Sequence, residues 1–138
     1  MNRKLASLMA ALLLLPSATH AQYAREAKPM AIGVWINPRG TVKVETGDCA
    51  GNLCGWVVWA APEAQADARD SGVARLIGTE LLRDYHSVGA GRYEGTVYVP
   101  DMGRSFFSRI RQQNADTLRI SGCILDGLIC KSQDWRRV

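Results

Sequence analysis

The residues of this chain that could do chemistry are few, and the cysteines are the clearest of them. They occur as two close pairs, Cys49 with Cys54 and Cys123 with Cys130. Each pair flanks a turn-like segment, so we expect two local disulfides that each hold a hairpin. A zinc site of four cysteines is the weaker alternative, because the second pair is spaced more widely than a usual zinc knuckle. A redox-active pair is also disfavoured, since the chain has no Cys-x-x-Cys.

The search for catalytic groups is mostly negative. His86 is the only histidine beyond residue 21, and no Gly-x-Ser-x-Gly elbow supplies a serine for it. The chain also has no His-Glu-x-x-His motif, phosphate-binding loop or dinucleotide fingerprint. Asp67 and Asp70 lack the dense oxygen ligands of a calcium loop. We therefore predict no enzyme, no cofactor and no metal site, and two carboxylates that meet in space are the enzymatic alternative.

The first 21 residues have the pattern of a secretory signal peptide. Basic Arg3 and Lys4 precede an apolar run, 5–15, that is too short to span a bilayer. Small residues follow up to Ala21, after which we expect cleavage. An uncleaved N-terminal anchor is the alternative. The pattern predicts a periplasmic or secreted protein, in a compartment where disulfides persist.

Cleavage would leave a polar lead over residues 22–30 and one domain over residues 31–138. It would remove two basic residues and no acidic one, so the formal charge falls from +4 to +2. Such a weak charge gives no reason to expect a nucleic acid or an anionic membrane as a partner. No later segment is apolar enough to predict a membrane-spanning helix. The oligomeric state is not predicted.

The domain itself has the pattern of an all-β protein. Short runs rich in Val, Ile, Trp and Tyr alternate with Gly, Asn, Asp or Pro. Eight such strands joined mostly by short turns predict a single antiparallel up-and-down barrel, because closure removes two exposed edges. A two-sheet sandwich is the alternative, and residues 61–74 are expected to form a long loop with at most a helical turn. The expected strands are 31–36, 41–46, 53–60, 79–86, 92–99, 104–111, 117–123 and 130–137.

An eight-stranded barrel has an interior that side chains fill or that holds one small ligand. Aromatic side chains are the candidates for the lining of a cavity, although they more often simply fill a core. In a regular strand, Trp56 and Trp59 would lie on opposite faces. Arg109, Arg111 and Arg119 could form a basic stripe for an anion, but a solvated outer face is favoured. The candidate lining residues are Trp35, Trp56, Trp59, Tyr98, Phe106 and Trp135.

The segment Gly33-Val34-Trp35 resembles the Gly-x-Trp signature of lipocalins and related calycins. In those proteins an arginine of the last strand packs over the tryptophan and closes the floor of the barrel. The resemblance assigns this part to Arg136 or Arg137. A guanidinium over an indole face contributes about 0.5–2 kcal/mol. An ordinary core tryptophan is the alternative.

A longer pattern resembles the bacterial exported family called "domain of unknown function 2147". The resemblance implies a small lipocalin-like barrel but no reaction and no catalytic residues. The chain departs from the family at 67–72, where an Asn-Pro element is replaced, so no function that rests on that loop is carried over. The pattern comprises Gly33-x-Trp35, the segment 49–59, Tyr98 to Gly103, Leu118 to Cys123, and Trp135-Arg136-Arg137.

These observations predict an exported barrel that binds a small, partly apolar or lipophilic ligand in the periplasm. The barrel-like spacing of the predicted strands along the sequence and the several aromatic residues motivate this interpretation. The alternative is an envelope protein that acts through protein–protein contacts or as a structural module, with a packed core that holds no ligand.

Overall fold

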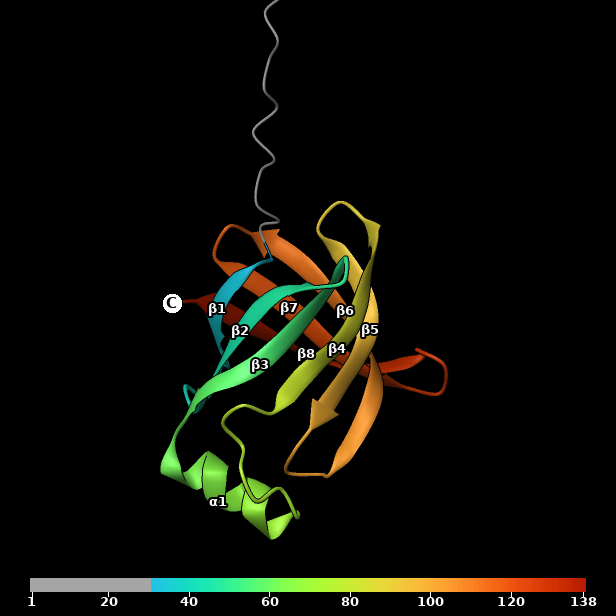
Figure 1. Cartoon of the computed structure of the whole chain (residues 1–138). Helices are drawn as coiled ribbons and strands as arrows, with labels where there is room; N and C mark the ends of the chain where they lie inside the picture. The colour runs from blue at the N-terminus through green and yellow to red at the C-terminus, as the bar shows by residue number, and fades with distance from the viewer. Residues whose placement is uncertain (1–30) are drawn as a thin grey trace, which may run out of the picture.

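The computed structural model describes residues 31–138, which form a closed barrel of eight antiparallel strands (Figure 1). Each strand pairs with the next along the chain, and β1 closes the barrel by pairing with β8. The predicted up-and-down barrel is thus confirmed. The predicted signal peptide and lead, residues 1–30, lie outside the described residues. The elements are β1 Gly33–Ile36, β2 Val42–Cys49, β3 Asn52–Ala60, α1 Pro62–Asp70, β4 Glu80–Gly89, β5 Arg92–Val99, β6 Arg104–Asn114, β7 Thr117–Ile124 and β8 Ile129–Arg137.

The main departure from the predicted elements is α1, a nine-residue helix where a loop was expected. Pro62 stands in the first turn, where its missing N–H costs nothing and its fixed φ suits a helix. Glu63 in the first turn and Arg69 in the last complement the helix dipole. Alanines supply helix propensity, and Ala68 is buried against the barrel. Figure 1 shows α1 beneath one end of the barrel.

Both predicted disulfides are confirmed. Cys49 is bonded to Cys54 in the β2–β3 hairpin, and Cys123 to Cys130 in the β7–β8 hairpin. Because successive strands run in opposite directions, these two hairpins lie at opposite ends of the barrel. The paired strands continue to the cysteines and beyond, so both hairpins are longer than the sequence pattern predicted.

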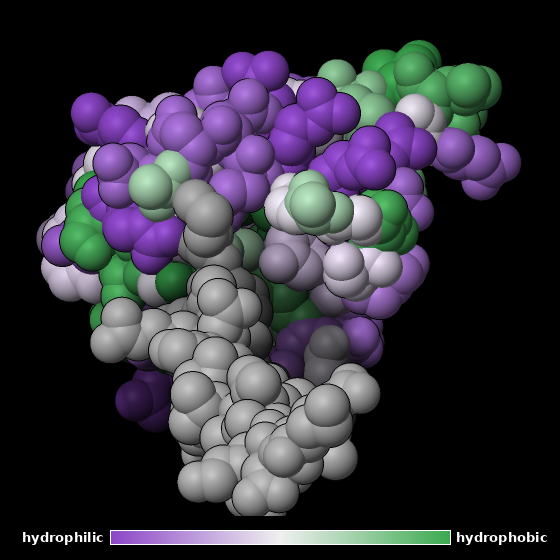
Figure 2. Space-filling view, turned by 90° about the horizontal axis from the view of Figure 1, so that it is seen from above, coloured by the Kyte–Doolittle hydropathy of each residue, from purple (hydrophilic) through white to green (hydrophobic). Residues whose placement is uncertain are grey.

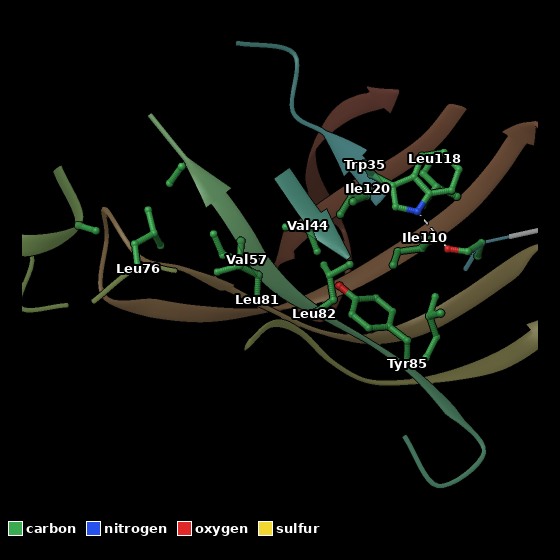
Figure 3. Close-up of a cluster of buried hydrophobic side chains, with 14 residues drawn as sticks. Trp35, Val44, Val57, Leu76, Leu81, Leu82, Tyr85, Ile110, Leu118 and Ile120 are labelled. Atoms are coloured by element: carbon green, nitrogen blue, oxygen red, sulfur yellow. Dashed lines mark hydrogen bonds between the residues drawn. The ribbon is translucent and has the colours of Figure 1, made fainter. Parts of the chain in front are cut away.

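The two ends of the barrel differ in packing. One end, where β1 begins and β8 finishes, is filled by Trp35, Tyr85, Ile110 and Leu118, all of which are fully buried (Figure 3). The other end carries the β1–β2, β5–β6 and β7–β8 turns together with α1. The barrel therefore has a packed floor and a mouth that α1 faces.

No helix among residues 31–138 combines the length and hydropathy needed to cross a bilayer.

Candidate ligand-binding lumen

A cavity of about 470 Å³ lies inside the barrel at the end that α1 faces. This volume falls in the range of about 300–1,000 Å³ that is typical of small-molecule sites. The β1–β2 turn, α1, the β5–β6 turn and the inner faces of β4 to β8 contribute to its wall. We call this space the lumen. Its apolar wall includes Leu76, Leu81, Leu82, Val97, Phe106, Ile120, Ile124, Ile129 and Trp135.

The floor beneath the lumen is built around Trp35. Its indole Nε1 donates hydrogen bonds to the carbonyl of Ala31 (3.1 Å, dashed in Figure 3) and to Oγ1 of Thr46 (3.1 Å). The Thr46 hydroxyl in turn donates to the Ala31 carbonyl at 2.5 Å. All polar atoms of this buried group are therefore paired, as burial requires.

Arg137 covers the outer side of this floor. Its guanidinium lies 4.1 Å from the centroid of the Trp35 ring. The same side chain donates to the carbonyl of Ile32 (3.0 Å) and to that of Ala115 (2.8 Å). The arginine that packs over the tryptophan and closes the floor, which the resemblance assigned to Arg136 or Arg137, is thus Arg137. Arg136 is exposed on the outer face of β8, because neighbouring strand residues point to opposite faces.

Gly33 makes the approach of Arg137 possible. A Cβ at this position would collide with Nη1 of Arg137. Its φ of +155° also lies outside the range that other residues readily adopt. The Gly-x-Trp segment is therefore a steric requirement of the floor.

Three of the six predicted lining residues border the lumen. Phe106 and Trp135 lie on the inner faces of β6 and β8, and both line the cavity. Tyr98 lies at the rim, with the guanidinium of Arg83 4.7 Å from its ring centroid. Trp35 lies below the lumen in the floor and does not line it.

Trp56 and Trp59 do not reach the lumen, which corrects their assignment to its lining. In the β2–β3 pairing, Lys43 of β2 lies opposite Trp59 of β3. The next residue of β2, Val44, pairs with Val57 and not with Val58. Val58 is therefore an extra residue in β3, and this bulge shifts the alternation by one. As a result both tryptophans point outward, and Trp59 is 41% exposed with Lys43 Nζ 5.2 Å from its ring.

The family model described as "Uncharacterized protein conserved in bacteria (DUF2147)" matches residues 33–137. This chain belongs to the DUF2147 family. The matched range runs from Gly33 to Arg137, so it includes every strand of the barrel and both residues that close the floor. In a family conserved in bacteria, two disulfides are consistent with an exported protein.

One solved structure similar to this DUF2147 barrel is that of protein HP1028 from the human pathogen Helicobacter pylori, which belongs to the lipocalin family. The two share 17% sequence identity with a TM-score of 0.62, over 78% of this chain and 82% of the other. At this identity the likeness shows a lipocalin-like fold alone. No curated protein matches this chain.

The lumen residues of this DUF2147 member that were not among the predicted lining include Lys131 and Gln133 of β8. Both line the cavity. A signal for them was present: if Trp135 points inward, alternation places Lys131 and Gln133 on the same face. The predicted lining consisted of aromatic side chains alone and so did not include these two polar residues.

Two hydroxyl groups, those of Tyr85 and Ser108, are buried in the packed interior of the barrel. Tyr85 and Ser108 are both fully buried, and neither hydroxyl makes a hydrogen bond of good geometry among the described residues. The ring of Tyr85 packs on Gly95, which leaves no room for a Cβ there, and its hydroxyl points toward Leu82 (Figure 3). Burial raises the pKa of Tyr85 well above its usual value, and the nearby Ser108 hydroxyl offsets only part of this shift.

The remaining candidates lie on the outer surface. Arg109, Arg111 and Arg119 are exposed. Arg109 lies 3.3 Å from a carboxylate oxygen of Glu94, and Arg119 makes two contacts with Asp134, of 2.7 and 2.8 Å. The stripe is therefore a solvated outer face in which two arginines are already paired with acids.

The described residues also bring no metal-binding set together. Within 31–138, no three His, Cys, Asp or Glu side chains are grouped so that they could hold a metal ion. His86 is exposed on β4, where its partner across the sheet is Glu94.

Proposed function

We propose that this protein is a periplasmic or secreted binding protein, without enzymatic activity, that holds one small, partly apolar ligand in its lumen. One observation carries the proposal: a cavity of about 470 Å³ stays open inside the barrel. Ile124 (49% exposed) and Ile129 (56% exposed) border it where the β7–β8 hairpin extends past the barrel, so an occupant of the cavity can cover part of their exposed surface. A barrel whose side chains fill the interior would leave no such space.

A ligand that covers these side chains would remove apolar surface from water. Each square ångström of apolar surface contributes about 25 cal/mol when it is buried. The opposite wall, formed by Leu81, Leu82 and Val97, offers further apolar contact. The apolar wall of the lumen thus favours the binding of an alkyl chain, and the mouth lets such a ligand enter.

Two glycines make a matched test. Gly122 lies on the inner face of β7, where a Cβ would be 3.6 Å from Val97 Cγ1. Gly47 lies on the outer face of β2, where a Cβ would be 3.7 Å from Trp56 Cζ3. Both distances are ordinary van der Waals contacts, so each position accepts a Cβ without a clash.

The experiment is an isothermal titration with 1-dodecanol, a neutral single-chain probe. We expect the wild type and Gly47→Phe to bind it equally, and Gly122→Phe to bind it at least about tenfold more weakly, because the phenyl ring occupies the lumen. Thermal unfolding of each variant verifies that it is folded. Equal binding by both folded variants, or no binding by the wild type of either 1-dodecanol or any charged C12 amphiphile, would refute the proposal.

A separate observation favours the alternative of a protein-interaction module. The turn of the β7–β8 hairpin exposes Leu125 (63%) and Leu128 (84%). This hairpin projects at the right of Figure 1, and a cluster of hydrophobic side chains stands at the same edge in Figure 2. Cross-linking in the envelope that is lost in Leu128→Ser, but retained in Gly122→Phe, would support this role.

A further inference from the structure

The inner face of β8 interrupts the apolar wall of the lumen with two polar side chains. Gln133 pairs across the sheet with Ile120, and Trp135 with Leu118. Both partners are buried, and directly paired residues point to the same face of a sheet, so Gln133 points inward. Lys131 lies two residues earlier and shares that face, opposite Gly122.

The amide of Gln133 has a fixed orientation. The indole Nε1 of Trp135 donates a hydrogen bond to Gln133 Oε1 at 3.1 Å. An indole N–H can only donate, so the amide oxygen must face Trp135. The amide NH₂ of Gln133 is then left as a donor group on the face of β8 that also carries Lys131.

Lys131 adds three more donors and a positive charge. None of the ion pairs among residues 31–138 includes it. The other charged groups that border the lumen are Arg39, Asp67 and Asp101, which lie in the β1–β2 turn, in α1 and in the β5–β6 turn at the mouth. The β8 wall itself therefore presents an amide NH₂ and an ammonium group, while the amide oxygen of Gln133 is engaged by Trp135.

We propose that Lys131 and Gln133 form an anion-binding subsite in the wall of the lumen, and that the ligand is a single-chain amphiphile with an anionic head. This inference rests on the proposed ligand-binding function. The head, a carboxylate or a phosphate, accepts hydrogen bonds from both side chains, and such charge-assisted bonds are stronger than neutral ones. The alkyl chain of the ligand lies against Leu82, Val97 and Phe106 on the apolar wall.

The test compares four C12 probes by titration calorimetry below their micellar concentrations. They are dodecanoate, dodecyl phosphate, 1-dodecanol and dodecyltrimethylammonium. We expect the wild type to bind the two anions at least about tenfold more tightly than the alcohol, and the cation most weakly. A preference between the two anions identifies the head as carboxylate or phosphate.

Two variants locate the effect. Lys131→Met removes the positive charge of the β8 wall with little change in side-chain length, and Arg136→Met removes one positive charge from the outer face of the same strand. We expect Lys131→Met to lower the affinity for the anions about tenfold and to leave that for 1-dodecanol unchanged. Arg136→Met should change neither affinity.

The outcomes separate the two proposals. If 1-dodecanol and the anions bind the wild type equally, and Lys131→Met has no effect, the anion subsite is refuted while the ligand-binding function stands. If no probe binds, both proposals fail. An equal loss of anion affinity in Lys131→Met and Arg136→Met would show a long-range charge effect and would also overturn the subsite.

Discussion

The guanidinium of Arg137 lies 4.1 Å from the centroid of the Trp35 ring, so the end of the last strand covers the centre of the first. The contact joins two residues that also pair directly across the β1–β8 closure. It closes one end of the barrel, and the lumen lies toward the other end, which α1 faces. The position of the cavity thus follows from this contact and from the packed floor beneath it.

Replacement of Arg137 by leucine should destabilise the barrel. The change removes the contact with the Trp35 ring and leaves the carbonyls of Ile32 and Ala115 without this donor. We expect a loss of about 2–3 kcal/mol in the free energy of unfolding. Urea denaturation measures it, with Arg136→Leu as the control, for which a change within about 0.5 kcal/mol is expected. Equal losses in both variants would contradict the assigned role.

A methyl group at Gly33 should have a comparable effect for a steric reason. The Cβ of Gly33→Ala would collide with Nη1 of Arg137, and the backbone conformation is unfavourable for alanine. We expect a loss of about 1–3 kcal/mol. In the Arg137→Leu background the loss should be smaller, because the colliding group is absent. A double-mutant cycle measures this coupling, and strictly additive losses would count against the contact.

The sequence predicted the barrel and the disulfides because both depend on local patterns. Alternation and turn residues mark the strands, and each cysteine pair spans a single hairpin. The orientation of Trp56 and Trp59 could not be predicted, because it depends on a bulge at Val58 in β3. The pairing of β3 with β2 determines where this bulge forms.

The lumen was harder to predict than the fold. The inward position of Lys131 follows from the register between β7 and β8, which no local motif encodes. A lysine in a strand usually faces solvent. The helical state of α1 was missed for a different reason: Pro62 and the charges indicated a break in the strand pattern, although they also suit the first and last turns of a helix.

The buried hydroxyl of Tyr85 gives a prediction in alkaline solution. Burial raises the pKa of Tyr85 above its ordinary value of 10.0. The folded state thus holds this proton more tightly than the unfolded state, so its contribution to stability is present below pH 10 and is lost as the pH rises further. We expect the wild type to lose stability above pH 10 by up to about 1.4 kcal/mol per pH unit more than Tyr85→Phe does.

At pH 7 the same variant should be as stable as the wild type or up to about 1 kcal/mol more stable. The hydroxyl that Tyr85→Phe removes is buried and makes no hydrogen bond of good geometry among the described residues, so its loss relieves a poorly compensated burial. Thermal unfolding monitored at pH 7 and between pH 10 and 11 measures both effects. A large loss of stability at pH 7 would show that the hydroxyl is paired after all.

Removal of the Cys123–Cys130 disulfide should have a modest effect on stability. The bridge closes a loop of only 7 residues in sequence separation, so it restricts the unfolded chain little. We expect the double variant Cys123→Ala, Cys130→Ala to lose no more than about 2 kcal/mol. Urea denaturation with and without reductant measures this loss. Non-reducing peptide mapping should link 123 to 130 and 49 to 54, and a link between the two hairpins would contradict the structure.

Native mass spectrometry of the protein purified from the bacterium that makes it tests the central claim most directly. We predict one bound molecule per chain, released on denaturation and detected in negative-ion mode as a single-chain anionic amphiphile. Gly122→Phe, expressed and purified in the same way, should carry none, while Gly47→Phe should carry it as the wild type does. Wild-type protein with the mass of the bare chain, or the same adduct on Gly122→Phe, would contradict the account.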